Sequence, residues 1–159
     1  MSRASGAGGA VSPVLARIIA TMGGAGYSPI APGTVGSIIG VTLYWVAYLE
    51  GSRVSLAVFL FIAIVAIWSA GHAERAAGKK DPSEIIVDEV AGQFLCLLGH
   101  APAMAHLVAG LVVFRILDIW KPFRWIEKFP GGWGIVADDL MAGGIGWVLL
   151  ALGYSWGYL

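Results

Sequence analysis

Long apolar stretches without any Lys, Arg, Asp or Glu alternate with short segments in which these charges gather. The uncharged stretches cover residues 18–49, 54–73, 90–114 and 140–159. Stretches of this length approach or exceed the roughly 20 residues that a helix needs to cross a bilayer core of about 30 Å. The pattern therefore predicts an all-α integral membrane protein built as a multihelical bundle.

Turn-forming residues divide these stretches into separate helices. The sequence Gly99-His100-Ala101-Pro102 suits a tight turn, so it splits the third stretch in two. A short helix over 13–22, which carries Arg17, precedes the spans and suits the membrane interface. We expect about six helices in all, four to five of them spanning, with candidate spans at 35–49, 54–70, 85–98, 103–120 and 140–159.

The charged residues indicate how the bundle is oriented. With the N-terminus in the cytoplasm, five crossings leave nine of the ten basic residues on the inner side, and only Arg53 lies outside. A Lys/Arg bias of this kind marks the cytoplasmic face. Nine of the ten acids also fall inside, Glu50 being the exception. Acids and bases on one side predict a polar site at the cytoplasmic face.

The composition narrows the class of protein further. Hydrophobic residues make up 58% of the 159 residues and charged residues 13%, which excludes a disordered chain and disfavours an ordinary soluble domain. A lone cysteine, Cys96, excludes a disulfide scaffold, and equal numbers of acids and bases give no basis for nucleic-acid binding. We expect a tail over 1–9 and one domain over 10–159.

The segment that leads into the predicted 85–98 helix carries the clearest chemical signal. Asp81 fits an N-cap and Pro82 the first helical position, which would put Asp88 and Glu89 a turn or more inside an apolar helix. Ionised carboxylates there are costly unless they are paired, hydrogen-bonded or bound to a cation. Gly92 leaves room beside them. We therefore expect Asp88 and Glu89 to belong to a functional site.

A second polar group ends the 103–120 helix. Arg115, Asp118 and Lys121 recur at intervals of three and share one side of the helix. An ordinary ladder of ion pairs would explain the same spacing. What favours function is that this group and the acids of the preceding helix fall on the same side of the membrane.

A third polar group lies before the last helix. A glycine-rich loop over 131–134 leads to Asp138 and Asp139, either of which could cap that helix. Carboxylates beside Arg and Lys, without a promising Ser-His or Cys-His pair, suit metal-dependent phosphoryl chemistry. Hard oxygen ligands select Mg²⁺, and cationic side chains neutralise phosphate oxygens.

Four groups of motifs follow one another along the chain: GYSP (26–29) with APGTVGS (31–37), VDE (87–89) with Gly92, FRILDIWKP (114–122), and GG (131–132) with GI (134–135), DD (138–139) and AG (142–143). Together they resemble the phosphatidylglycerophosphatase A family over most of the chain, from about Gly26 to Gly146. The resemblance implies an all-helical bundle with one central helix, for which we choose 85–98. It also implies Mg²⁺-dependent release of the terminal phosphate of phosphatidylglycerophosphate, giving phosphatidylglycerol, at the cytoplasmic face of the bacterial inner membrane.

The resemblance and the charges together suggest a role for each candidate residue. Asp118 would be a further metal ligand or a base, and the glycine-rich segment 23–36 would offer donors to the headgroup. The carboxylates expected to hold Mg²⁺ and orient the attacking water are Asp88, Glu89, Asp138 and Asp139. The side chains expected to bind the substrate are Arg115 and Lys121 at the terminal phosphate, and Ser28, Thr34 and Ser37 at the headgroup.

Several alternatives stay open at the level of sequence. A membrane protein that binds or transports an ion or an anionic lipid without turnover would use similar charges. A phosphatase for another lipid phosphate would share the motifs. Attack by water and an aspartyl-phosphate intermediate are both compatible with the acids, as are one or two metal ions. Gly36 and Gly40 could pack helices within one chain or in a homo-oligomer.

Overall fold

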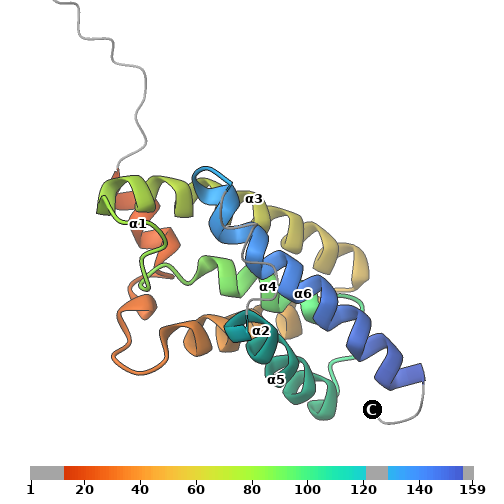
Figure 1. Ribbon diagram of the computed structural model, residues 1–159. Coiled ribbons are helices and arrows are strands. Elements are labelled where there is room, and N and C mark those ends of the chain that lie inside the picture. The colour runs from red at the N-terminus through yellow and green to blue at the C-terminus, as the bar shows by residue number, and fades with distance from the viewer. Residues whose placement is uncertain (1–12, 121–128, 156–159) are drawn as a thin grey trace, which may run out of the picture.

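The computed structural model describes residues 13–120 and 129–155, and all regular structure within them is helical. The predicted tail over 1–9 and Lys121 lie outside these residues. The multihelical bundle expected from the sequence is confirmed (Figure 1). Its elements are α1 (Pro13–Ala20), the 3-10 helix η1 (Ala25–Tyr27), α2 (Pro32–Leu49), α3 (Ser52–Ala77), α4 (Val87–Leu97), α5 (Met104–Trp120) and α6 (Gly132–Ser155).

Helix α4 is the centre of the bundle, as the sequence predicted. Nine of its eleven residues are buried, and it contacts α1, α2, α3, α5 and α6. Figure 1 shows α4 enclosed between α2, α3 and α6. The most extensive of these contacts is with α6, the next with α2. Anything placed on α4 is therefore held by most of the other helices.

The central helix is shorter than the span predicted over 85–98. Eleven residues at 1.5 Å each extend about 16 Å, roughly half of a 30 Å bilayer core. Helix α4 is thus enclosed by protein and does not cross the bilayer by itself. Among the described helices, those long and apolar enough to cross a membrane are α2, α3 and α6.

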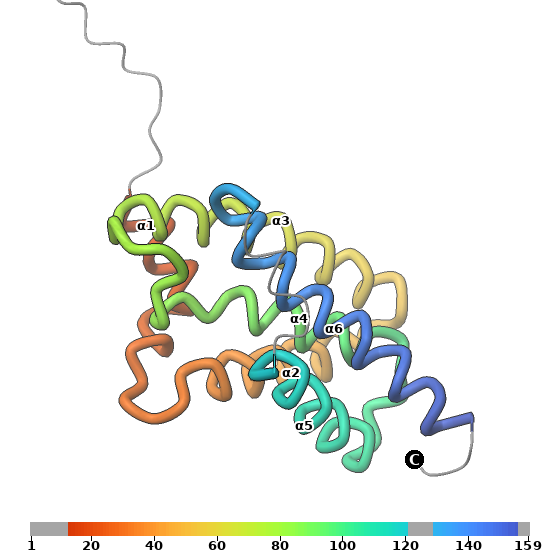
Figure 2. The backbone as a smooth tube through the Cα atoms, in the orientation of Figure 1, coloured from red at the N-terminus to blue at the C-terminus, as the bar shows by residue number. Residues whose placement is uncertain are grey.

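The start of α4 also differs from the prediction that Asp81 caps a helix beginning at Pro82. Asp81 has a positive φ of 47°, and the Ile85 N–H donates to the Pro82 carbonyl in a separate turn. The N–H of Ile86 then donates to the carbonyl of Ala20 at the end of α1. This contact holds the incoming chain beside α1, a path that Figure 2 traces. The helix begins only at Val87.

Glycines bring the neighbouring helices into direct backbone contact with α4. A Cβ atom at Gly36 would lie 2.8 Å from the Ile86 carbonyl oxygen, and one at Gly40 would lie 2.9 Å from the Cβ of Gln93. Both distances are too short for a side chain. The small-residue face predicted at Gly36 and Gly40 therefore packs α2 on α4 within one chain.

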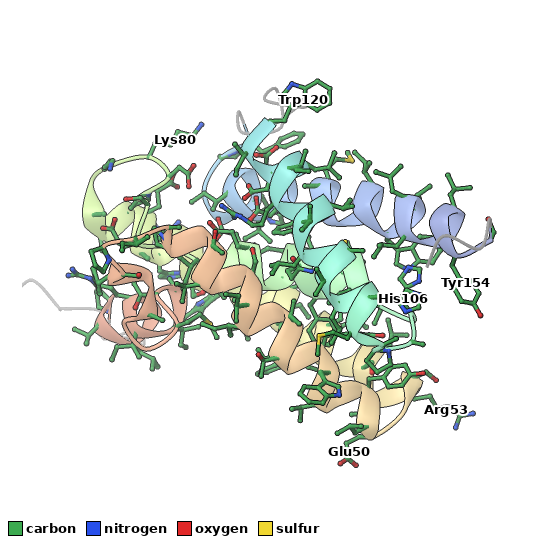
Figure 3. All side chains as sticks on the ribbon, turned by 90° about the horizontal axis from the view of Figure 1, so that it is seen from below. Glu50, Arg53, Lys80, His106, Trp120 and Tyr154 are labelled. Carbon is green, nitrogen blue, oxygen red and sulfur yellow. The ribbon has the colours of Figure 1, made fainter. Side chains whose placement is uncertain are left out.

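The end of the bundle opposite the start of α4 is held by an apolar core and by hydrogen bonds to the turn between α4 and α5. The Tyr44 hydroxyl donates to the His100 carbonyl, and the Trp147 indole N–H donates to the Leu98 carbonyl at 2.6 Å. These bonds join α2 and α6 to the turn between α4 and α5. Figure 3 shows Glu50 and Arg53 projecting outward at the turn between α2 and α3.

Candidate active site

Three carboxylates from two helices converge at the start of α4. Asp88 and Glu89 lie in its first turn, and Asp139 lies in the second turn of α6. One oxygen from each of the three carboxylates lies within 4.8 Å of the others. The fold thus brings together two motifs that are some 50 residues apart in the sequence, and it does so through the closest helix pair of the bundle.

Asp88 and Asp139 are buried and Glu89 is half-buried, and the loss of solvent raises the pKa of the two carboxyls on α4. Helix α4 lies inside the bundle and is not among the candidate membrane spans. Desolvation raises the pKa of the Asp88 carboxyl to about 6, against bonds from backbone N–H groups in the first turn that lower it. Desolvation and the nearby Asp88 raise the pKa of Glu89 well above its ordinary range. Three close carboxylates are therefore unfavourable together without a compensating cation.

Two features of this cluster suit a divalent cation: its oxygen atoms are hard ligands, and some of them have no hydrogen-bond partner among the described residues. The Oδ1 atom of Asp88 and the Oε2 atom of Glu89 are buried and accept no hydrogen bond within the described part of the chain. Buried carboxylate oxygens are normally satisfied by hydrogen bonds, counter-charges or metals. Hard oxygen donors of this kind suit Mg²⁺ or Ca²⁺.

Asp138 and Asp139 do not cap α6, which was the alternative left open by the sequence. The helix begins at Gly132, so both acids lie beyond its first turn. A Cβ atom at Gly132 would overlap the Ile67 carbonyl of α3, so the glycine start of α6 is held directly against α3. Both carboxylates are buried, and Asp138 lines a cavity next to the cluster.

A guanidinium group lies beside the carboxylates. Arg115 of α5 forms an ion pair with Asp118 one turn later, with Nη1 and Oδ2 2.5 Å apart. A Cβ atom at Gly33 would lie 2.8 Å from the same Nη1 and would overlap the Glu89 carboxylate. The first turn of α2 therefore packs against both charges, and a side chain at residue 33 would displace one or both of them.

Two cavities meet at the carboxylate cluster and share Asp81, Asp88 and Asp139. The larger, of about 350 Å³, lies between the start of α2 and the end of α5, and the smaller, of about 270 Å³, lies between the loop before α4 and the start of α6. The residues that distinguish the larger cavity include Gly33, Glu89, Arg115, Asp118 and Ile119. Those that distinguish the smaller one are Lys80, Gly134, Ile135 and Asp138.

The predicted hydroxyl donors lie outside both cavities. The Ser28 hydroxyl donates to the Ile30 carbonyl and the buried Ser37 hydroxyl donates to the Gly33 carbonyl, each at 3.0 Å. Thr34 does not line either cavity, and the larger one is lined instead by Ala31, Pro32 and Gly33. Sequence reasoning treated Asp81 as a cap and gave Lys80 no role, although both line the smaller cavity.

Comparison with known proteins identifies the family. The family model for phosphatidylglycerophosphatase A matches residues 18–154. The chain belongs to this family. Phosphatidylglycerophosphatase A of Escherichia coli K12 is 36% identical over 139 residues, which cover 84% of this chain and 80% of the relative. A Bacteroides thetaiotaomicron protein provisionally named phosphatidylinositol-3-phosphatase is 36% identical over 148 residues, 85% and 91% of the two chains.

Family membership makes the protein a lipid phosphatase of the phosphatidylglycerophosphatase type, which confirms the enzyme predicted from the sequence. The alternative of a binding or transport protein without turnover is set aside. No solved structure matches the chain. The family also suits the geometry, because a carboxylate cluster that could hold a metal ion lies beside an arginine that could bind phosphate.

Proposed function

We propose that the protein hydrolyses phosphatidylglycerophosphate to phosphatidylglycerol and inorganic phosphate, with Mg²⁺ as cofactor, as a step of bacterial phospholipid biosynthesis. The observation that carries this proposal is the cluster of Asp88, Glu89 and Asp139 next to Arg115 in one cavity. Oxygen donors and a guanidinium group together match a metal ion and a phosphate. Membership of the phosphatidylglycerophosphatase A family supports the choice of substrate.

The metal site would consist of Asp88, Glu89 and Asp139, with Asp138 as a further candidate ligand. Three hard carboxylate oxygens favour Mg²⁺, which commonly binds through a few carboxylates, waters and substrate phosphate. When bound, Mg²⁺ would polarise the phosphate and lower the pKa of a water molecule. The close approach of α4 and α6 at Gly92 would fix the distance between the two halves of this site.

The protein's own groups would bind the phosphate and handle the proton. Arg115 would neutralise the terminal phosphate oxygens, and Asp118 would hold the guanidinium in position or serve as a ligand or base. Lys121 would be a second cation that binds the terminal phosphate. In direct hydrolysis a water oxygen attacks phosphorus and the bond to the glycerol oxygen breaks. A carboxylate accepts the proton of the water, and the glycerol oxygen takes up a proton.

We further propose that the protein is a multi-pass protein of the inner membrane with this site at the cytoplasmic face. Three described helices, α2, α3 and α6, are long and apolar enough to cross. The positive-inside bias of the sequence supports the orientation. The acyl chains of the substrate would then stay in the bilayer while its headgroup enters the bundle.

A second candidate substrate is a phosphorylated inositol lipid. It is favoured by the name of the Bacteroides relative, which matches this chain over most of both sequences. The same site could bind any lipid that carries a phosphomonoester, because the proposed metal and phosphate ligands would contact the phosphate and not the alcohol beside it. The choice between the two lipids therefore depends on groups outside the carboxylate cluster.

Phosphate release from a panel of substrates tests the proposal. The protein, purified in detergent, is given phosphatidylglycerophosphate, phosphatidylinositol 3-phosphate, phosphatidic acid or a soluble phosphomonoester, with Mg²⁺ or with a chelator. We expect the highest kcat/KM for phosphatidylglycerophosphate and loss of activity with the chelator. A preference for the inositol lipid would select the second candidate. Full activity in the chelator would contradict the metal assignment.

A further inference from the structure

The rim of the larger cavity is apolar on the side of α2 and α5, whereas exposed Asp81 and Ser83 line it on the side of the loop before α4. Ile119 of α5 lines the cavity and is 72% exposed, and Ile116, one turn earlier, is 58% exposed. Across the opening, Ile30 is 80% exposed and directly precedes the residues of α2 that line the cavity. Exposed isoleucines clustered around a pocket mark a surface that meets an apolar partner.

Charged groups lie immediately inside this rim. Arg115 is in the same cavity as Ile119, and its ion pair with Asp118 lies one turn before the end of α5. The Glu89 carboxylate reaches the same space from α4. A ligand that fits both the rim and the interior carries an anionic group joined to apolar chains. This is the chemistry of a lipid phosphate and not of a soluble phosphomonoester.

The smaller cavity has a different entrance. Exposed Lys80, on the loop that precedes α4, lines only this one of the two cavities, whereas the adjacent Asp81 lines both. A neighbouring surface pocket carries Arg75, Lys79 and Lys80. Figure 3 shows Lys80 projecting from this loop and Trp120 projecting from the end of α5, at separate places on the bundle. The carboxylate cluster therefore lies between an opening that carries exposed isoleucines on the side of α2 and α5 and an opening lined by charged residues of the loop before α4.

We propose that the opening between the start of α2 and the end of α5 is the lateral portal by which the lipid substrate reaches the site from the membrane. The phosphate passes to Arg115 while the acyl chains stay against Ile30, Ile116 and Ile119. The smaller cavity faces water. This inference rests on the proposed function, because it assumes a lipid phosphate as substrate, and it adds the face of the bundle on which that lipid lies.

The portal is tested by changing its rim without changing the charged interior. The variants are Ile119→Asn and Ile30→Asn, each measured with long-chain phosphatidylglycerophosphate in vesicles and with a short-chain form that is monomeric in water. The matched control is Ile18→Asn on α1, which is not a candidate span; its side chain is 51% exposed, and the helix makes no contact with α5 in the described structure. Ile119→Leu keeps the rim apolar.

We expect the two rim variants to raise KM for the vesicle substrate about tenfold, the size of effect expected from losing the contacts of one apolar side chain. Turnover of the short-chain substrate should stay at the wild-type level. The Ile18→Asn and Ile119→Leu variants should match wild type with both substrates. This pattern would support the portal, because general damage to the fold would reduce turnover of both substrates.

Two results would overturn the portal. Equal losses with both substrates would mean that the rim residues act on the structure of the site, and unchanged kinetics in both rim variants would place lipid entry elsewhere. Failure of the proposed function looks different, because the wild-type protein would then release no phosphate from either form of phosphatidylglycerophosphate.

Discussion

The two ends of α4 are buried to a similar degree but differ in what surrounds them. At the first turn, Asp88 and Glu89 present buried carboxylate oxygens that accept no hydrogen bond within the described residues. Near the last turn, Phe94, Cys96 and Leu97 are completely buried in an apolar core. Burial at the last turn stabilises the fold, whereas burial at the first turn costs stability that a bound cation can restore.

The comparison suggests that the two ends of α4 have different roles, one in the stability of the fold and one in the candidate active site. The apolar end fixes the position of α4 through edge-to-face packing of Phe94 on Tyr44, whose ring centroids are 5.4 Å apart. The helices that pack on α4 at the apolar end also surround its polar end, and so they position the carboxylates there. Variants at the two ends should therefore separate stability from activity.

The largest effect is expected at the polar end. Glu89→Gln removes a metal ligand or base and should lower phosphate release by about 10²-fold or more. It should leave the stability of the metal-free protein unchanged or raise it, because one buried like charge is removed. Phosphate release and thermal unfolding in detergent measure both.

The matched control for this change is Glu50→Gln, in an exposed residue at the opposite end of the bundle. It should leave phosphate release at the wild-type level. Near wild-type turnover in Glu89→Gln would remove Glu89 from the site. A drop in both activity and unfolding temperature would make Glu89 a structural residue instead.

The opposite outcome is expected at the apolar end. Phe94→Ala creates a cavity in a fully buried position and should cost about 3–5 kcal/mol of unfolding free energy. The fraction that remains folded at low temperature should keep its turnover number, because the carboxylate cluster lies more than one turn away. Denaturant unfolding and active-fraction kinetics measure the two quantities. Loss of turnover without loss of stability in Phe94→Ala would contradict the assignment of separate roles to the two ends of α4.

A smaller effect is expected in the middle of α4, where this helix packs closely against α6. Gly143 packs against the backbone of Gly92, and a Cβ atom there would overlap the Gly92 carbonyl. Gly143→Ala should cost about 1–3 kcal/mol through overpacking. It should also reduce kcat, because it moves α6 and hence Asp139 away from α4.

The control for this change is the neighbouring Gly144→Ala, since a Cβ atom at Gly144 would meet nothing within 4 Å. This substitution should leave kcat at the wild-type value and should stabilise the helix slightly, by about 0.5–1 kcal/mol. Differential unfolding and steady-state kinetics on the pair measure the contrast. Equal behaviour of the two alanine variants would show that the distance between α4 and α6 does not matter for turnover.

The helices and several of the candidate site residues can be predicted from the local pattern of apolar and charged residues. Uncharged stretches predicted the helices because a helix enclosed by apolar surroundings must itself be apolar, and Asp88 and Glu89 stood out because charge is rare in such a segment. The spacing of Arg115 and Asp118 predicted a shared helix side, and the structure pairs them. The ligand roles of these residues stay predictions.

What local pattern did not predict depends on contacts between distant segments. The start of α4 is delayed to Val87 by the hydrogen bond from Ile86 to Ala20, which no capping rule contains. Ser37 satisfies its hydroxyl on its own helix, at Gly33, and so does not reach the cavity. A basic loop residue normally indicates only a solvated surface, so the sequence pattern does not predict that Lys80 lines a cavity.

The most direct test of the carboxylate cluster is thermal unfolding as a function of Mg²⁺ concentration, in wild type, Asp88→Asn and Glu50→Gln. A ligand that binds only the folded state at about 100 times its Kd stabilises by about 2.7 kcal/mol. We predict that Mg²⁺ raises the Tm of wild type and Glu50→Gln, and has little effect on Asp88→Asn. A Tm independent of Mg²⁺ in wild type, or an equal rise in Asp88→Asn, would contradict the metal site.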